Sequence, residues 1–200
     1  KPPLAGCLNR PGTHNVLNAR AAIAVATELD VADGAIQSAL AKFAGIDRRL
    51  QQNGDVETPN GRVTLVDDYG HHPTELAATL EAVRQGWAGR RIVLAFQPHR
   101  YSRTRDLLDD FANVLAGVDA LIVTEVYAAG EVPIAGADGK AICRAVRTHG
   151  RVEPIYLEKV EQLAETLKPI VREADVVVTM GAGSIGAVAA ELPKTLRASA

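Results

Sequence analysis

The side chains best suited to chemistry lie within residues 67–73, which hold two carboxylates, a phenol and two imidazoles. A short apolar run precedes Asp67 and Asp68, so the alternation of a strand would send them to opposite faces and leave at most one facing a ligand. His72 has a structural explanation, because it stands before Pro73 and can cap the helix that the proline begins. Capping does not account for the whole group, and we interpret the remaining carboxylate, phenol and imidazole as part of a binding or proton-transfer site.

A second segment, residues 97–105, places His99 beside three arginines. Arg100 and Arg103 are three residues apart, so on the first turn of a helix they would point the same way. A guanidinium is a planar donor that matches a carboxylate or a phosphate. We interpret Arg100 and Arg103 as ligand-binding residues, and Arg105 as a surface residue that pairs with a nearby aspartate.

Two further patterns are ambiguous taken alone. Asn15 and Asn18 share one face near the start of an expected helix, where an amide can read an adenine edge or cap the helix. Residues 181–186 match G-x-G-x-x-G, which is typical of a dinucleotide site when it opens the first βαβ unit and an acidic residue follows about 20 positions later. Here only one helix follows, so we interpret this segment as a tight strand–helix turn.

The elements that must position these groups alternate along the chain from about residue 47. Short, continuously apolar runs predict strands at 63–67, 91–96, 120–124, 154–157 and 176–180. Helices are expected from Pro73, and over 104–115, 139–147, 160–171 and 185–192. Such strands favour a Rossmann-like α/β fold, in which a mostly parallel sheet carries helices on both faces. Because ligands bind beyond the carboxyl ends of parallel strands, the segments at 67–73 and 97–105 should meet.

The first 46 residues differ, because they predict two helices, 14–29 and 35–43, with no strand between them. We expect residues 1–46 to be the end of one domain and residues 47–200 to form the next. The chain begins at Lys1, without an initiator Met or an apolar leader, which suggests a cut within a longer polypeptide.

The composition excludes some classes of partner. The net charge of −2 gives no general attraction to nucleic acid, and no apolar run is long enough for membrane insertion. Cys7 and Cys143 are far apart and lack metal-ligand spacing, which favours reduced thiols and a cytoplasmic location.

Five segments resemble, in the same order, those of the Mur ligases, and the resemblance covers essentially the whole chain. They are residues 12–18 (GTHNVLN), 43–49 (FAGIDRR), 67–75 (DDYGHHPTE), 96–104 (FQPHRYSRT) and 180–183 (MGAG). The third and fourth are closest to the branch that joins L-alanine to UDP-N-acetylmuramic acid. Residues 1–46 would then end a central ATP-binding domain, and residues 47–200 would be the C-terminal amino-acid-binding domain.

The resemblance implies an ATP-dependent ligase of peptidoglycan synthesis, and hence a role in cell shape and division. In that reaction ATP with Mg²⁺ phosphorylates the muramoyl carboxylate, and the amino group of L-alanine attacks the acyl phosphate to give an amide, ADP and phosphate. A carboxylate is a poor acyl donor until phosphate becomes its leaving group. The attack then needs a proton acceptor and stabilisation of the oxyanion.

The resemblance also implies a division of labour among the candidate residues. Asn15 and Asn18 would lie at the nucleotide, with Asn15 at adenine, while Arg49 would neutralise phosphate charge and Asp68 would hold the ribose hydroxyls. The residues that would face the amino acid and the reacting carboxyl are Tyr69, His71, His99, Arg100 and Arg103. The imidazoles and guanidiniums of that group are expected to be catalytic, with an arginine on the alanine carboxylate and His71 near the amine.

The sequence also departs from the family pattern. Ser184 follows Gly-Ala-Gly where the family often has aspartate, so that loop receives no specific role. The phosphate loop, the Mg²⁺ ligands and the UDP-binding domain are expected upstream, and these 200 residues alone are expected to be inactive. The alternatives are a ligase that recycles a preformed tripeptide, a dinucleotide-binding oxidoreductase domain, and a non-catalytic binding domain.

Overall fold

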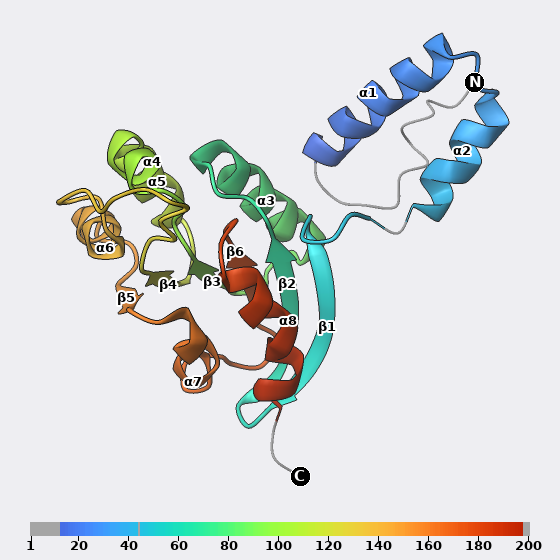
Figure 1. The fold of residues 1–200 in the computed structure, drawn as a ribbon. Helices are drawn as coiled ribbons and strands as arrows, with labels where there is room; N and C mark the ends of the chain where they lie inside the picture. Colours follow the sequence, from blue (N-terminus) through green and yellow to red (C-terminus); the bar gives the residue numbers. More distant parts are fainter. Residues whose placement is uncertain (1–12, 44, 198–200) are drawn as a thin grey trace.

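A computed structural model describes residues 13–43 and 45–197 and contains one six-stranded sheet (Figure 1). The strands are β1 (Gln51–Thr58), β2 (Gly61–Asp68), β3 (Ile92–Phe96), β4 (Ala120–Thr124), β5 (Pro154–Leu157) and β6 (Val176–Met180). Their order across the sheet is β1-β2-β6-β3-β4-β5, and every neighbouring pair is parallel except β1 with β2. The prediction of a mostly parallel sheet is confirmed.

Strand β1 was not predicted, because its sequence, QQNGDVET, has no apolar run. It is one of the two edge strands of the sheet, and most of its side chains are partly or fully exposed, so it needs few apolar residues. A tight turn joins it to β2, where Gly61 has a φ of 118° and a Cβ would lie 2.7 Å from Glu173 Cα.

Helices cover both faces of the sheet, as predicted. One core lies under α3 (Pro73–Gly86), α5 (Leu108–Leu115) and α6 (Gly139–Thr148). The other lies under a 3₁₀ turn (Val160–Gln162), α7 (Leu163–Leu167) and α8 (Ile185–Thr195). The central strand β6 serves both cores, because Val176, Val178 and Met180 face the first and Val177 faces the second.

Two predicted helices are interrupted. The helix expected over 104–115 is α4 (Tyr101–Asp106) followed by α5, with Leu107 between them at φ −120°. This break lets Leu107 and Leu108, which are adjacent in sequence, both pack against the first core. The helix expected over 160–171 is the 3₁₀ turn and α7, which ends before Pro169, a residue without a backbone N–H to continue it.

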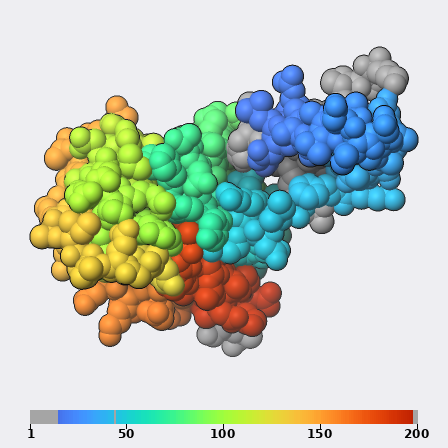
Figure 2. Space-filling model, turned by 45° about the horizontal axis from the view of Figure 1, so that its top comes forward, coloured from blue at the N-terminus to red at the C-terminus, as the bar shows by residue number. Residues whose placement is uncertain are grey.

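The two N-terminal helices, α1 (Thr13–Glu28) and α2 (Asp33–Lys42), stand apart from the sheet and contact each other (Figure 1). In the space-filling view they form a lobe beside the larger body (Figure 2). Helix α1 reaches α3, and its exposed apolar residues include Leu17 and Val25. The division into residues 1–46 and 47–200 remains a prediction.

Within the described ranges no helix is long and apolar enough to cross a membrane. Cys143 is a buried free thiol, and burial raises its pKa to about 11. Cys7 lies outside the described residues.

Candidate functional site

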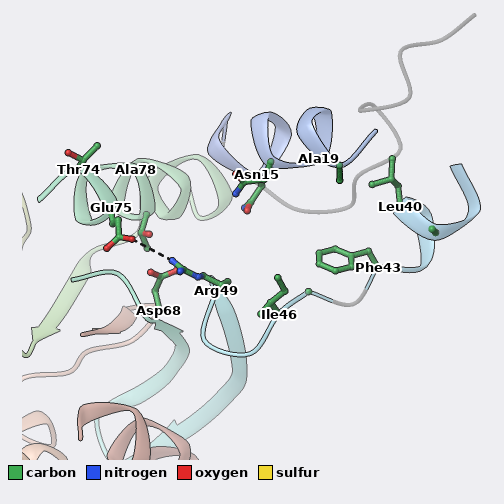
Figure 3. Close-up of a pocket in the computed structure, with 15 residues that line it drawn as sticks. Asn15, Ala19, Leu40, Phe43, Ile46, Arg49, Asp68, Thr74, Glu75 and Ala78 are labelled. Atoms are coloured by element: carbon green, nitrogen blue, oxygen red, sulfur yellow. Dashed lines mark ion pairs between the residues drawn. The ribbon is translucent and has the colours of Figure 1, made fainter. Parts of the chain in front are cut away.

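A pocket of about 740 Å³ lies where the N-terminal lobe meets the carboxyl end of β2 (Figure 3). Helices α1 and α2 supply an apolar wall that includes Ala19, Ala22 and Leu40, and the segment after α2 adds Phe43 and Ile46. The polar groups that line the pocket are Asn15, Asn18, Arg49, Asp68, Thr74, Glu75 and Thr79. The pocket thus combines an apolar wall for a flat ring with groups that can bind hydroxyls and an anion.

Asp68 is the most buried acid of this pocket, at 3% exposure. Its two carboxylate oxygens accept hydrogen bonds from the backbone amides of Leu50 and Gly70, each at 2.7 Å. Burial raises the pKa of Asp68, although these amides, Arg49 and the Thr79 hydroxyl act in the opposite direction. Each oxygen has a second lone pair, so the carboxylate can also accept from a ligand hydroxyl.

Tyr69 separates the pocket from a second group of side chains. Its ring lies under two guanidiniums, with Arg48 Cζ 5.2 Å and Arg49 Cζ 5.6 Å from the ring centroid. The edge of the ring meets His71, with 5.5 Å between centroids. Arg49 is half exposed and its Nη1 forms a long ion pair of 3.8 Å with Glu75, so its guanidinium can turn to an anion in the pocket.

His71 and His99 come from different strand ends and lie together, with 5.3 Å between ring centroids. His71 Nδ1 is 3.1 Å from the carbonyl oxygen of Tyr69. Because a carbonyl oxygen only accepts, this contact assigns the proton of a neutral ring to Nδ1 and leaves the lone pair on Nε2. His71 can therefore accept a proton from a ligand amine through Nε2.

Arg103 and Arg100 lie on the far side of His99. Arg103 Nη1 is 3.3 Å from His99 Nδ1 and donates to the His99 carbonyl oxygen at 3.1 Å. Arg100 has a φ of 74° and is exposed, and its Nη1 is 3.6 Å from Glu131. The two arginines and two histidines thus line one edge, which suits a ligand that carries both a carboxylate and an amine.

Tyr127, in the segment after β4, completes this edge. Its ring stacks on His99 with 5.5 Å between centroids and 14° between planes. Its backbone accepts from Arg100 N at 2.9 Å and donates to Pro98 at 2.8 Å. Tyr127 follows the strand predicted over 120–124, but the sequence analysis assigned it no role.

Burial lowers the pKa of His99, and the neighbouring charges of His71, Arg103 and Arg100 lower it further. We expect the His99 ring to titrate below its ordinary value of 6.5, and the change Arg103→Gln to raise its pKa by removing one positive charge. The folded pKa lies below the unfolded one, so the stability linked to His99 is present above pH 6.5 and is lost as the pH falls through the folded value. An NMR titration of the imidazole tests this.

The matched control is Arg105→Gln on the same helix, because Arg105 pairs with Asp106 at 2.7 Å. The pKa of His99 should be the same in this variant as in the wild type. An equal rise in both variants would contradict a local effect of Arg103.

The glycine-rich turn before α8 is filled by the protein's own side chains. Gln97 Oε1 accepts from Ile185 N at 2.9 Å, and Gln97 Nε2 donates to the Ser184 hydroxyl at 3.1 Å. Arg48 Nη2 donates to the Gly181 carbonyl oxygen at 2.6 Å. An amide that a dinucleotide phosphate would need is thus already bonded, which favours the prediction of a structural turn over a dinucleotide site.

The family described as Mur ligase, glutamate ligase domain, matches residues 48–183. The chain belongs to the Mur ligase family. The predicted resemblance and fold class are therefore confirmed.

The relatives of this Mur ligase chain include UDP-N-acetylmuramate–L-alanine ligase of Burkholderia multivorans, which is 61% identical over 191 residues. The same ligase of Cupriavidus necator is 59% identical over 194 residues. These matches cover 95% and 96% of this chain but 41% of each relative, so the chain spans about two fifths of their length.

Solved structures agree with the fold. The crystal structure of UDP-N-acetylmuramate–alanine ligase from Thermotoga maritima has a TM-score of 0.74 and 31% identity, and covers 92% of this chain and 38% of that one. A murein peptide ligase from Psychrobacter arcticus has a TM-score of 0.67 and 24% identity, covers 96% of this chain and 39% of that one, and shows the fold alone.

The structure of this Mur ligase chain divides the predicted site residues into two neighbouring groups. Asn15, Asn18, Arg49 and Asp68 line the pocket, whereas Tyr69, His71, His99, Arg100 and Arg103 form the adjoining edge. Their individual roles remain predictions. Residues that the sequence did not single out are Arg48, Gln97 and Glu131, whose contacts join segments far apart in the chain.

Proposed function

We propose that this chain is the C-terminal part of an ATP-dependent ligase that joins L-alanine to UDP-N-acetylmuramic acid through an acyl phosphate. The observation that carries the proposal is the 61% identity, over 95% of the chain, to a protein named for that reaction. The adjoining pocket and histidine–arginine edge support it, because the reaction needs a nucleotide and an amino acid side by side.

ATP would occupy the pocket between the lobe and the end of β2. The apolar wall fits adenine, and the amide of Asn15 can pair with its edge. Asp68 would accept from the ribose hydroxyls, and Arg49 would neutralise phosphate charge at the pocket rim. Asn18 lines the same wall as Asn15 and would also lie at the nucleotide.

L-Alanine would bind along the edge formed by Tyr69, the two histidines and the two arginines. Arg103 and Arg100 would hold its carboxylate, because a guanidinium donates two parallel hydrogen bonds to it. Its amino group would then lie near His71, whose Nε2 can accept the proton that the nitrogen loses as the C–N bond forms and phosphate leaves. The lowered pKa of His99 suits this step, since an uncharged ring would not repel the nitrogen as that nitrogen becomes cationic during its attack.

Magnesium is proposed for the complete enzyme, but not as a ligand of the residues seen here. Among the described residues no group of three or more His, Cys, Asp or Glu side chains is placed to hold a metal ion. We propose that the metal ligands and the phosphate loop lie in the part of the relatives' length that this chain does not span. The same reasoning predicts that the 200 residues alone catalyse no turnover, and ATP as a substrate suggests a cytoplasmic enzyme.

Two other functions are less well supported. A tripeptide-recycling ligase would share the fold, but the murein peptide ligase is 24% identical whereas the L-alanine ligase is 61% identical. A dinucleotide-dependent oxidoreductase would need the glycine-rich turn, and Gln97 and Arg48 already bond to it.

The test is a protein extended to the length of the curated relatives, assayed for phosphate release with ATP, Mg²⁺ and UDP-N-acetylmuramic acid. We expect release that depends on L-alanine and is much slower with the tripeptide as acceptor. The reverse preference would replace this proposal with the recycling reaction. Release of phosphate by the 200-residue chain alone would contradict the proposed split of the active site.

A further inference from the structure

Arg48 joins three segments that meet at the carboxyl ends of β2 and β6. Its Nε donates to Asp67 Oδ2 at 2.8 Å, and its Nη2 donates to the Gly181 carbonyl oxygen at 2.6 Å. Asp67 is 2% exposed, and its other oxygen accepts from the Thr179 hydroxyl at 2.7 Å. The ion pair is therefore directional and largely shielded from water.

The backbone of Arg48 is held as firmly as its side chain. Its amide donates to Gln51 Oε1 at 2.7 Å, and its carbonyl oxygen accepts from Tyr69 N at 2.7 Å. Arg48 and Leu50 both have positive φ, at 56° and 46°, a conformation that side-chain-bearing residues adopt only when their surroundings hold them there.

The guanidinium of Arg48 lies against the first turn of α8 at Gly186. A Cβ at Gly186 would be 2.4 Å from Arg48 Cζ and 2.6 Å from its Nε. Position 186 must therefore lack a side chain for the guanidinium to reach Asp67 and Gly181. The last glycine of the G-x-G-x-x-G pattern, Gly186, therefore leaves room for the guanidinium of Arg48.

This arrangement bears on the neighbouring site residues. Arg49 follows Arg48 directly in the chain. Because the Arg49 side chain is half exposed, the position of its guanidinium depends mainly on the conformation of its backbone. Tyr69 is held by its hydrogen bond to the Arg48 carbonyl oxygen and by the guanidinium 5.2 Å from its ring centroid. The Asp68 carboxylate accepts a hydrogen bond from the backbone amide of Leu50, which lies two residues after Arg48.

We propose that Arg48 is a positioning residue, which fixes the conformation of residues 48–50 and so presents Arg49 to the nucleotide. This inference rests on the proposed ligase function for its kinetic consequence but not for its structural one. A purely structural Arg48 would support stability and leave the affinity for ATP unchanged. A positioning Arg48 sets the KM for ATP.

Two variants are decisive. Arg48→Lys keeps the positive charge but loses the planar guanidinium that donates to both Asp67 and Gly181. The double variant Arg48→Met, Asp67→Asn removes both charges of the buried ion pair at once. The double change avoids leaving a lone buried carboxylate, which would endanger folding. In the protein at the relatives' length we expect both to raise the KM for ATP by about tenfold, since small displacements of a positioning group have large effects. The KM for UDP-N-acetylmuramic acid should stay unchanged.

Gly186→Ala tests the same geometry from the other side, because its methyl group would displace the guanidinium without altering Arg48. We expect a similar rise in the KM for ATP, and no further rise when it is combined with Arg48→Lys. The matched control is Gly34→Ala, also the second residue of a helix, where a Cβ meets nothing within 4 Å. It should behave as the wild type.

Hydrogen exchange separates this inference from the proposed function. In the Arg48→Lys and Gly186→Ala proteins the amides of Leu50 and Tyr69 should exchange about tenfold faster than in the wild type, whatever reaction the protein catalyses. Wild-type protection and an unchanged KM for ATP in the double variant would overturn the inference. If the wild type at the relatives' length were inactive but amide exchange were faster in the variants, the ligase function would be rejected. The role of Arg48 in holding residues 48–50 would still stand.

Discussion

Arg103→Met, in a protein of the relatives' length, should lower kcat/KM for L-alanine by about 10²- to 10³-fold. The guanidinium lies beside His99 at the edge where we propose that the amino-acid carboxylate binds. Removing one partner of a hydrogen-bonded charge pair costs about 2–5 kcal/mol, a range that includes the roughly 3–4 kcal/mol equivalent to that loss. The loss should appear mainly in the KM for L-alanine, measured by phosphate release at saturating ATP.

Arg105→Met is the matched control for this change. Arg105 lies two residues further along α4 but is exposed and pairs with Asp106. Its removal should change kcat/KM by less than about twofold, because its ion pair with Asp106 is exposed and screened by solvent. Equal losses in the two variants would mean that α4 acts through general charge, and full activity of Arg103→Met would remove Arg103 from the site.

Asp68→Ala should reduce both the stability of the fold and the affinity for ATP. The change leaves the buried amides of Leu50 and Gly70 without an acceptor, which costs about 1–3 kcal/mol for each. We therefore expect the free energy of unfolding, measured with urea, to fall by about 2–6 kcal/mol in total. The KM for ATP should rise at least tenfold if the carboxylate also holds the ribose.

Asp68→Asn separates these two effects, because its amide oxygen can still accept one of the hydrogen bonds. It should be more stable than Asp68→Ala, while its KM for ATP stays raised. The pKa of Asp68 is raised in the fold, so the stability that it contributes is full below 3.8 and is lost as the pH rises through the folded value. The stability advantage of the wild type over Asp68→Asn should accordingly shrink with rising pH, and a growing advantage would contradict the assigned direction.

Much of the fold could be predicted because the buried strands are short, mostly apolar runs that can be recognised in the sequence. Residues 176–180 are apolar except for Thr179 and lie between two helix-covered faces, so sequence and structure agree on β6. Strand β1 lacked that signal, since an edge strand can be polar and still pair with its neighbour. The break at Leu107 depends on packing against α3 and the sheet, which a helical period alone does not report.

The candidate site divides in the same way. His71 and His99 could be found because reactive side chains follow consecutive strands, and parallel strands bring their ends together. The role of Arg48 could not be found in this way, because its guanidinium contacts Gly181, which is 133 residues away, and the first turn of α8 at Gly186, which has no side chain. The apolar wall was also missed, since Ala19 and Ala22 are ordinary helix residues until a second element faces them.

The pocket has one wall on the N-terminal lobe and the other at the end of β2. A ligand that touches both walls acts as a reversible cross-link between the two parts of the chain. Its measured affinity therefore includes the free energy of holding those parts in one relative orientation, whereas a compound confined to the Asp68 side escapes that cost. An inhibitor that spans both walls should consequently gain affinity from any substitution that pre-organises the segment joining α2 to β1, while a one-wall inhibitor should be indifferent to it.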